Sequence, residues 1–348
     1  MQVLFKIIRQ TKNSPHQIQT YLLETEPGNT ILDCLNRIKW EQDGSLAFRK
    51  NCRNTICGSC AMRINGRSAL ACKENVGSEV ERLQIQKNAG SQLDPIPEII
   101  VAPMGNMPVI KDLVVDMSSF WNNLEAIEPY VSTDARQVPE REFLQTPEER
   151  SQLNQTGNCI MCGACYSECN AREVNQDFVG PHALAKAYRM VADSRDTDAE
   201  RLEKYNQDTA GVWGCTRCLY CNSVCPMDVA PLDQITKIKQ EILADKNVPD
   251  SRPIRHRKVL VELAKQGGWI DERAFALQVT SDYFRDLKGL LSIVPLGLRM
   301  LIKGKFPLSF EASIGTSEVR SLIQSVQEQE AKEHNQVLSI ENSLTPDP

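Results

Sequence analysis

Eight cysteines between residues 159 and 225 constrain this 348-residue chain more than any other feature. They form two copies of one pattern, Cys159-x2-Cys162-x2-Cys165-x3-Cys169 and Cys215-x2-Cys218-x2-Cys221-x3-Cys225-Pro226. Two-residue gaps on a tight turn bring three thiolates to three corners of one iron–sulfur cube, and the fourth thiolate leaves along a helix toward the neighbouring cube. The spacing therefore predicts two cubane clusters with crossed ligation.

The crossed arrangement assigns each cysteine to one cluster. One four-iron cluster is expected on Cys159, Cys162, Cys165 and Cys225. Its neighbour is expected on Cys215, Cys218, Cys221 and Cys169. Two redox centres held side by side are suited to relaying electrons.

Two other roles for these cysteines fit the pattern less well. A zinc site needs only four thiolates or imidazoles, usually as two separated pairs, and the crowded runs supply more than that. Disulfides need an oxidising compartment, whereas the initial stretch MQVLFKIIRQTK has neither the long apolar run nor the cleavage site of an export signal. We therefore favour iron–sulfur clusters over these alternatives.

A third cysteine group precedes the two runs. It consists of Cys52-x4-Cys57-x2-Cys60 and, eleven residues later, Cys72. This is the plant-type spacing for a two-iron cluster, with a zinc site as the alternative on spacing alone. Gly58 permits close backbone approach, and loop amides can donate hydrogen bonds to the cluster sulfurs. Residues 61–71 indicate a hairpin with a type I′ turn at Asn65-Gly66, which returns the chain to the cluster.

The first hundred residues combine strands with one helix around this loop. Alternating apolar residues predict strands near residues 3–7 and 17–23, separated by a turn at residues 13–15. Thr30 is expected to cap a helix with Asp33 in its first turn, and Gly44 to close it. Cys34 lies among the apolar positions of that helix, which favours a buried small side chain. Together these elements indicate a β-grasp ferredoxin domain.

Composition and the remaining patterns exclude several classes of function. The net charge of −5 does not favour nucleic-acid binding, and there is no Gly-rich dinucleotide fingerprint. None of the four histidines stands in a catalytic pattern, so we expect no catalytic residue and no cofactor beyond the clusters. The most apolar late stretch, residues 290–302, is too short to span a bilayer, so any membrane contact must be peripheral.

The later part of the chain is expected to be mostly helical. A Pro- and Gly-rich stretch at residues 89–110 marks a domain boundary. Helices are predicted over residues 181–192, 197–206, 232–243 and 275–291, the second of them exposed and charged. Residues 328–348 are polar and are expected to be disordered.

Several segments carry a family resemblance. They are the loop of residues 52–60, the segment Met104-Gly-Asn-Met-Pro-Val-Ile-Lys-Asp-Leu-Val-Val-Asp-Met117, Leu144-Gln-Thr-Pro-Glu-Glu-Arg150 and Gly180-Pro-His-Ala-Leu-Ala-Lys-Ala-Tyr-Arg-Met-Val-Ala-Asp-Ser-Arg195. Over residues 1 to 243 the chain resembles the iron–sulfur subunit of succinate dehydrogenase and fumarate reductase. The resemblance implies a 2Fe–2S centre nearest a flavoprotein, a middle 4Fe–4S centre, and a third centre on Cys169, Cys215 and Cys221 nearest the membrane.

The chain departs from that family at two places. Common members have an apolar residue at the position of Cys218 and carry a three-iron cluster, whereas the extra thiolate here predicts a complete 4Fe–4S cluster, with 3Fe–4S if Cys218 is not a ligand. Common members also follow the equivalent of Cys169 with Pro and paired Trp, and that of Cys215 with His, for a quinone pocket. Here those places hold residues 170–175 and Thr216. The pattern is similar to complexes whose membrane-side subunit is cysteine-rich and resembles heterodisulfide reductase.

The sequence therefore predicts an α+β protein of three parts: a β-grasp 2Fe–2S ferredoxin domain at residues 1–105, an α-helical two-cluster ferredoxin domain at 106–245, and a helical extension with a disordered tail at 246–348. By resemblance, it relays single electrons between an FAD-containing flavoprotein subunit and a quinone-linked or cysteine-rich membrane-side subunit. We expect it in the cytoplasm, attached to the membrane face through these partners. The alternatives are a subunit of a thiol-linked fumarate reductase or another flavoenzyme complex, and a non-redox zinc protein.

Overall fold

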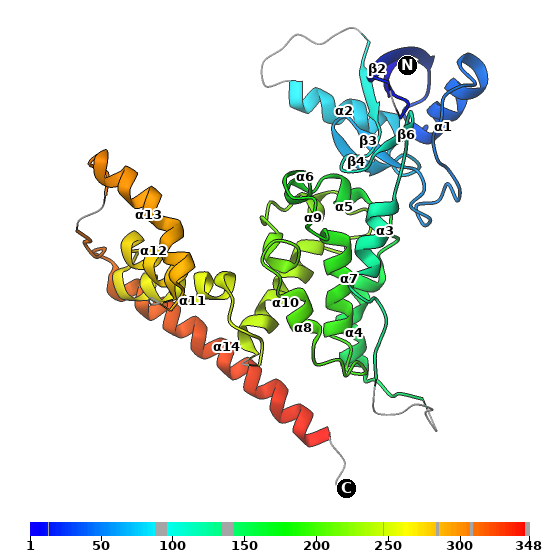
Figure 1. Ribbon diagram of the computed structural model, residues 1–348. Helices are drawn as coiled ribbons and strands as arrows, with labels where there is room; N and C mark the ends of the chain where they lie inside the picture. Colours follow the sequence, from blue (N-terminus) through cyan, green and yellow to red (C-terminus); the bar gives the residue numbers. More distant parts are fainter. Residues whose placement is uncertain are drawn as a thin grey trace. The chain divides into compact units, whose positions relative to one another are not determined.

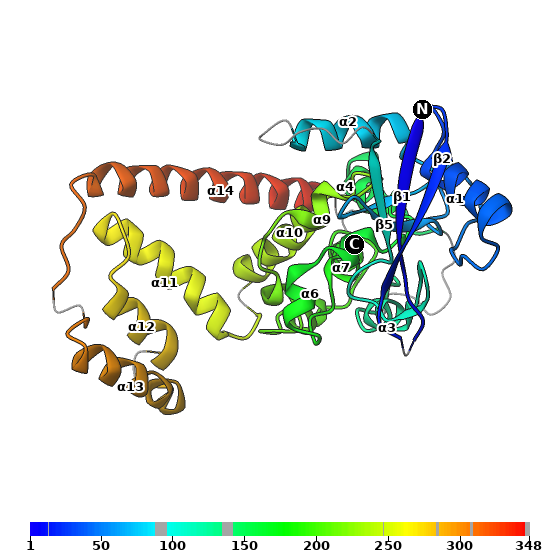
Figure 2. The same cartoon turned by 90° about the horizontal axis from the view of Figure 1, so that it is seen from above.

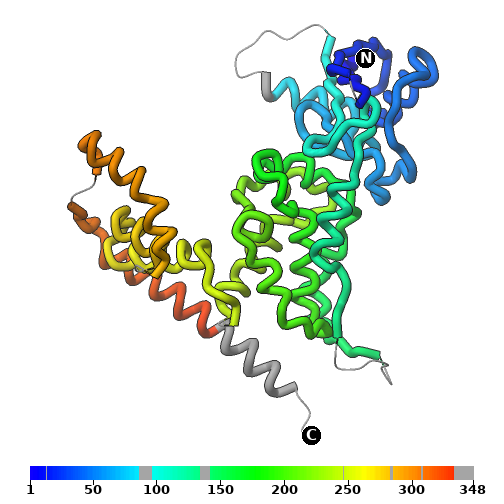
Figure 3. Tube along the Cα trace, viewed as in Figure 1, coloured from blue at the N-terminus to red at the C-terminus, as the bar shows by residue number. Residues whose placement is uncertain are grey.

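The computed structural model describes residues 1–12, 14–87, 96–133, 142–245, 247–282, 285–306 and 309–344, without the side chains of residues 86–87 and 333–344 (Figure 3). Packing divides the chain into two compact units, Met1–Val248 and Pro249–Pro348. The α+β class and the order of the predicted parts are confirmed, because a sheet domain precedes a helical region and a helical C-terminal unit. No helix within the described ranges is long and apolar enough to cross a bilayer.

The N-terminal domain is built on a five-stranded sheet in the order β2-β1-β5-β3-β4 (Figures 1 and 2). The strands are β1 (Gln2–Arg9), β2 (Gln17–Glu24), β3 (Ala61–Ile64), β4 (Arg67–Leu70) and β5 (Glu98–Ala102). β1 and β2 form an antiparallel pair, as do β3 and β4, and the central strand β5 is parallel to β1. This mixed sheet with a helix across it is the predicted β-grasp arrangement.

Local sequence signals explain these elements. The alternation in β1 buries Val3, Phe5 and Ile7 completely on one face of the sheet. Helix α1 (Ile31–Arg37) begins with the predicted capping box, in which Thr30 and Asp33 exchange hydrogen bonds. It continues as a π-helical turn, Ile38–Gln42, that ends at Asp43, one residue before the predicted stop. The 13–15 turn includes Asn13, which lies outside the described residues.

The β3–β4 hairpin forms with the predicted two-residue turn. Asn65 and Gly66 both have positive φ, +49° and +84°, as a type I′ turn requires. Helix α2 (Val76–Lys87) follows, and part of the Pro- and Gly-rich stretch (residues 88–95) lies outside the described residues. After β5 the chain forms a small two-stranded ribbon, β6 (Val109–Lys111) with β7 (Val114–Val115), and enters the helical region.

The helical region of the first unit packs short helices around two cysteine runs. Its elements are α3 (Ser118–Glu125), α4 (Pro147–Gly157), α5 (Ala164–Ser167), α6 (Asn170–Val174), α7 (Pro181–Val191), α8 (Arg201–Tyr205), a 3-10 turn (Val212–Gly214), α9 (Tyr220–Ser223) and α10 (Pro231–Ala244). The predicted helices at residues 181–192 and 232–243 correspond to α7 and α10. Both begin at a proline, whose fixed φ suits the first helical position.

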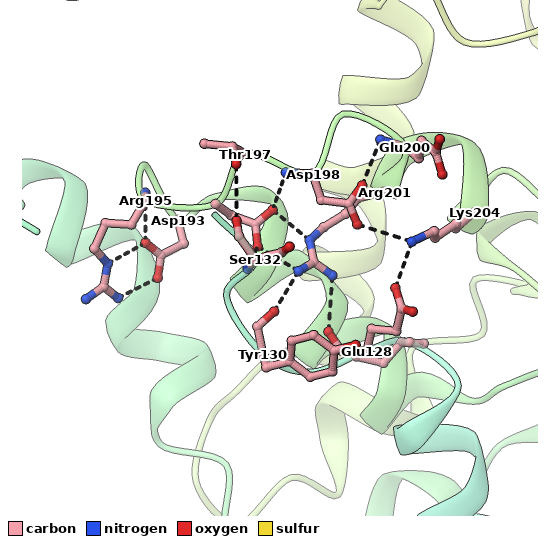
Figure 4. A network of polar contacts seen from close by, with 12 residues as sticks. Glu128, Tyr130, Ser132, Asp193, Arg195, Thr197, Asp198, Glu200, Arg201 and Lys204 are labelled. Carbon is pink, nitrogen blue, oxygen red and sulfur yellow. Dashed lines mark hydrogen bonds and ion pairs between the residues drawn. The ribbon is translucent and has the colours of Figure 1, made fainter. Parts of the chain in front are cut away.

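The prediction of an exposed charged helix at residues 197–206 is wrong. Only the five residues of α8 are helical, and Arg201 and Tyr205 within it are buried. The Arg201 guanidinium pairs with Asp196 at 2.6 Å and donates to the carbonyls of Glu128 and Tyr130, more than 70 residues away (Figure 4). This buried polar network fastens the segment after α3 to the helical region.

The second unit contains α11 (Arg252–Gly267), α12 (Glu272–Ser281), α13 (Leu287–Ile302) and α14 (Thr316–Leu344). The single helix predicted over 275–291 is in fact two helices, because Asp282 takes a left-handed conformation and Asp286 caps α13. The prediction of a disordered tail from residue 328 is wrong as far as Leu344, because α14 continues to that residue. Gln, Glu, Ala and Lys in this segment favour helix. Residues 345–348 lie outside the described residues.

Replacing Arg201 by Leu is expected to destabilise the protein by about 3–5 kcal/mol, because Asp196 keeps a buried charge without its partner. The matched control is Lys204→Leu, which removes ion pairs with Glu128 and Asp198 in which the lysine is about 40% exposed, each worth about 0–1 kcal/mol. Thermal unfolding of the two anaerobically purified variants compares these costs. Equal midpoints for both variants would contradict the role given to the buried pair.

Candidate iron–sulfur centres

The first cysteine group lies on a loop whose backbone is repeatedly left-handed. Arg53, Thr55 and Gly58 have φ of +57°, +60° and +69°. This conformation is unfavourable for a β-branched residue such as Thr55 and persists only where the surroundings impose it. In the loop it turns successive amide N–H groups toward the cysteines.

Four amide contacts reach the sulfurs of this group. The amides of Asn54 and Cys57 donate to Cys52 Sγ at 3.3 and 3.4 Å, the amide of Cys52 to Cys57 Sγ at 3.4 Å, and that of Thr55 to Cys72 Sγ at 3.4 Å. Such donors stabilise negative charge on sulfur. A hydrogen bond from the Ser59 side chain, together with the Cys52 amide, lowers the pKa of Cys57 to about 6.

The β3–β4 hairpin completes this group from the other side. Cys60 directly precedes β3 and Cys72 follows β4, and the Ala71 amide donates to the Cys60 carbonyl at 3.1 Å. Burial raises the pKa of Cys60 to about 12, and the neighbouring thiols of Cys72 and Cys57 add to the shift. The structure thus brings all four predicted cysteines of this group together.

The two later runs share one backbone conformation. Two and four residues after its first cysteine, each run has a left-handed residue: Met161 and Gly163 in one, Arg217 and Leu219 in the other. Each pair leads into a short helix, α5 or α9, that carries the third cysteine. Since three of these four residues are not glycine, the loop geometry is imposed by what the loops enclose and contact.

The fourth cysteine of each run lies with the other run. Cys162 is close enough to Cys159 and Cys225 for their charges to act on it. Cys165 is affected by Cys162 and Cys159 and, less strongly, by Cys225, and all four thiols line one cavity. The grouping predicted for the first cubane is therefore present in the structure.

The second run forms the reciprocal group. The thiol charges acting on Cys221 are those of Cys215, Cys169 and Cys218, and Cys169 is affected by Cys215 and Cys218. Cys218 thus joins the other three, and it is the exposed member. Cys221 acts on Cys165 more strongly than Cys225 does, which shows that the two groups are close neighbours.

A small apolar cavity lies within the first of these groups. It is lined by Cys159, Cys162, Cys165, Cys225, Phe120, Ile160, Met161, Gly163, His182, Ala185, Pro226, Met227, Val229 and Pro231. Burial raises the pKa of Cys162 to about 11 and that of Cys165 well above its usual value. Thiolates in such a setting need a compensating positive charge inside the cavity, and iron ions supply it. The donor set therefore fits an iron–sulfur cluster.

Over the ranges described, no group of three or more His, Cys, Asp or Glu side chains is placed to hold a metal ion. In a cubane each thiolate binds a different iron.

His182 also lines this cavity, and the structure agrees with a packing role. Its ring stacks on Phe120 at a centroid distance of 3.9 Å, and its Nε2–H donates to the Phe120 carbonyl at 2.8 Å. Burial lowers the pKa of His182 to about 3, so the imidazole is neutral near pH 7. A neutral ring adds no charge to the cavity.

The first and second groups are in direct contact. A Cβ built on Gly58 would lie 2.9 Å from both Cα and Cβ of Cys162. Gly163, one residue further, is equally close to Met107, where a Cβ would lie 3.0 Å from the methyl carbon. Glycine at position 58 lets the loops of the two groups touch, and glycine at 163 makes room for Met107 of the 104–117 segment. Sequence spacing alone did not reveal these contacts.

Polar residues that sequence reasoning missed hold the two loops in place. The Asn106 side-chain amide donates to the carbonyls of Tyr166, Ser167 and Cys169 at 2.9, 3.2 and 3.1 Å. Asn106 therefore fixes the end of α5, where Cys169 departs toward the other group. The sequence feature that could have pointed to Asn106 is the Gly-Asn turn in the 104–117 segment.

The β3–β4 hairpin adds a second set of contacts between the sheet domain and the loop of the second group. Ser68 Oγ lies 2.7 Å from Ser167 Oγ and 2.8 Å from a Glu168 oxygen, and Arg63 pairs with Glu168 at 3.0 Å. These contacts join the sheet domain to α5 within the first unit (Figure 1). The three cysteine groups therefore form a connected row.

Comparisons with known proteins agree with this geometry. Residues 4–122 match the 2Fe-2S iron-sulfur cluster binding domain family, and residues 155–229 match the 4Fe-4S dicluster domain family. Over 245 residues the chain is 33% identical to the mitochondrial succinate dehydrogenase [ubiquinone] iron-sulfur subunit 3 of Arabidopsis thaliana, covering 69% of this chain and 74% of the plant protein. The chain belongs to the family of succinate dehydrogenase iron–sulfur subunits.

This membership confirms the predicted resemblance and class of cofactor. The chain carries 2Fe–2S and 4Fe–4S domains, and its family supplies the iron–sulfur, electron-transferring component of an oxidoreductase complex. A solved structure of the Mycobacterium smegmatis Sdh1 complex in the apo form matches its fold, with a TM-score of 0.60 and 24% identity over 72% of this chain and 99% of that one. A hypothetical protein from Helicobacter pylori reaches a TM-score of only 0.47 at 16% identity.

Replacing Gly58 by Ala tests the contact between the first two groups. The added methyl meets the Cys162 backbone and strains a left-handed residue, for an expected cost of about 2–3 kcal/mol and reduced iron content. The control is Gly66→Ala, where φ is also positive but no atom lies within 4 Å of the added Cβ. Thermal unfolding and iron analysis compare the variants, and an equal loss in both would mean that strain alone, and not contact, explains the effect.

Proposed function

We propose that twelve cysteines hold three clusters. The ligand sets are Cys52, Cys57, Cys60 and Cys72 for a 2Fe–2S centre; Cys159, Cys162, Cys165 and Cys225 for a 4Fe–4S centre; and Cys169, Cys215, Cys218 and Cys221 for a third centre. The exchange of Cys169 and Cys225 between the runs is the observation that carries this proposal. Cys34 is excluded because it is buried in the apolar core, with its sulfur 3.4 Å from Thr25 Oγ1.

The function we propose is a relay of single electrons between a flavoprotein subunit and a membrane-side subunit. The clusters, when bound, supply the one-electron redox chemistry, and the protein contributes their spacing and electrostatic surroundings. Support comes from the two ends of the row. The first group includes the exposed Cys52, and the third group includes the exposed Cys218. Apolar residues beside these cysteines are also exposed, among them Ile56, Leu219 and Tyr220. Such surfaces are suited to docking partner proteins at the two ends.

The third centre is proposed to be a complete 4Fe–4S cluster. Cys218 lies among the charges that act on both Cys169 and Cys221, as a fourth ligand must. Full thiolate ligation adds negative charge around the cluster compared with a three-iron centre, and this lowers its reduction potential. The chain would then deliver electrons from this end at lower potential than the common members do.

The membrane-side partner is proposed to be a cysteine-rich subunit resembling part of heterodisulfide reductase, and the chain is proposed to attach to the membrane peripherally through its partners. The residues expected of a quinone pocket are replaced by α6, with Val174 largely exposed, and by the exposed Thr216. The same replacements fit a thiol-linked fumarate reductase, which would pair this chain with a thiol-oxidising subunit. The identity of the partner separates the two.

Replacing Cys218 by Ser is expected to remove one thiolate from the third centre only. Electron paramagnetic resonance of the oxidised, anaerobically prepared protein should gain a three-iron signal or lose the third centre, while the other two centres remain. Cys34→Ser, which removes a thiol outside all three groups, is the control and should leave the spectra unchanged. A three-iron signal already present in the intact parent protein would refute the ligand role of Cys218.

Purification of the native complex tests the relay itself. We expect an FAD-containing subunit and a cysteine-rich membrane-side subunit to copurify, and succinate to reduce the clusters of this chain in stoichiometric amounts. Reduction by a thiol donor with fumarate as the acceptor would favour the thiol-linked alternative. Copurification without any flavoprotein would contradict the proposed function.

A further inference from the structure

Helix α13 of the second unit exposes an apolar stripe. Six of its apolar side chains are each more than half exposed: Leu287, Leu291, Val294, Leu298, Leu301 and Ile302. Their spacing of three, four and seven residues places them on one side of the helix. Single exposed apolar residues are ordinary, but a continuous stripe along a whole helix marks a binding surface.

The opposite side of α13 packs within its own unit at Gly289, while Leu296, further along that side, is exposed. Gly289 is buried against α12, where a Cβ would lie 1.8 Å from the Thr280 carbonyl oxygen. α13 runs beside α12 in both views (Figures 1 and 2). The unit's own apolar cluster is formed by Val259, Leu263 and Val279 on α11 and α12. The stripe therefore lies on the side of α13 away from this packing.

The charges along the stripe itself are all positive, and the one acid beside it, Asp286, caps the start of α13 by accepting from the Gly289 amide at 2.8 Å. Lys288, Arg299 and Lys303 are exposed and lie together along one flank of the helix, and the exposed Lys305 follows. From residue 287 to residue 310 the sequence contains no Asp or Glu. Long basic side chains beside an apolar face place their charged ends at the level of lipid headgroups.

We propose that this face of α13 binds an anionic lipid surface, with the helix lying in the plane of the membrane. The 16 residues of α13 span only about 24 Å, less than the hydrocarbon core of a bilayer, so the helix lies along the surface instead of crossing it. A second copy of this chain is a poor occupant, because the two basic flanks would repel each other. The inference goes beyond the relay, since it gives this chain a lipid contact of its own.

Vesicle flotation with the full-length protein, reconstituted anaerobically with its clusters, tests the proposal. The probes are vesicles of phosphatidylcholine alone and vesicles in which about one third of the lipid is phosphatidylglycerol. We expect binding to the anionic vesicles at low salt, and a large loss of binding to neutral vesicles or at high salt.

Two pairs of variants assign the binding to α13. Leu291→Glu with Leu298→Glu should weaken binding roughly tenfold or more, whereas Leu322→Glu with Val326→Glu on α14, also exposed apolar positions, should not. Lys288→Gln, Arg299→Gln and Lys303→Gln together should weaken it roughly a hundredfold. The charge control is Arg257→Gln with Lys258→Gln on α11.

Unchanged circular dichroism and cluster absorbance in every variant confirm that the variants fold. The charge variants provide a second test that does not depend on the Leu→Glu pair. The proposal is overturned by absence of binding to anionic vesicles, by unchanged binding of the α13 variants, or by equal losses in the controls. It is also overturned if the parent protein ignores vesicles but forms a dimer that Leu291→Glu with Leu298→Glu dissociates, because a second copy then covers the face.

Discussion

The structure depends on the free-energy cost of bringing several thiolates close together in a protein interior. Burial and mutual repulsion raise the pKa values of Cys60, Cys162, Cys169 and Cys221 to between about 11 and 12. Metal-bound sulfur removes that cost, so cluster binding and folding of the cysteine loops are coupled. The repeated left-handed residues in these loops belong to the same coupling, since their strain is sustained by contacts on both sides.

Direct contacts hold the three cysteine groups next to one another. Gly58 against Cys162, Asn106 at the end of α5, and Ser68 with Glu168 fix the sheet domain to the first cubane loop. The exchange of Cys169 and Cys225 then fixes that loop to the second run.

Sequence patterns predicted the features that depend on neighbouring residues. The capping box at Thr30, the Asn65-Gly66 turn and the proline starts of α7 and α10 all follow from local chemistry. The grouping of cysteines was also predictable, because spacing on a turn determines it. The environment of Arg201 was not, since its carbonyl partners lie more than 70 residues earlier in the chain. The roles of Gly58 and Asn106 were likewise not predictable, because a glycine or asparagine shows its role only when the opposing loop is known.

Metal and sulfide analysis of the isolated chain tests the central claim most directly. After anaerobic reconstitution with iron and sulfide, three bound clusters predict about ten iron and ten acid-labile sulfide per chain, with no zinc. About nine iron would mean a three-iron third centre and would leave the row itself intact. A colourless chain without iron, or one holding zinc without sulfide, would contradict the account.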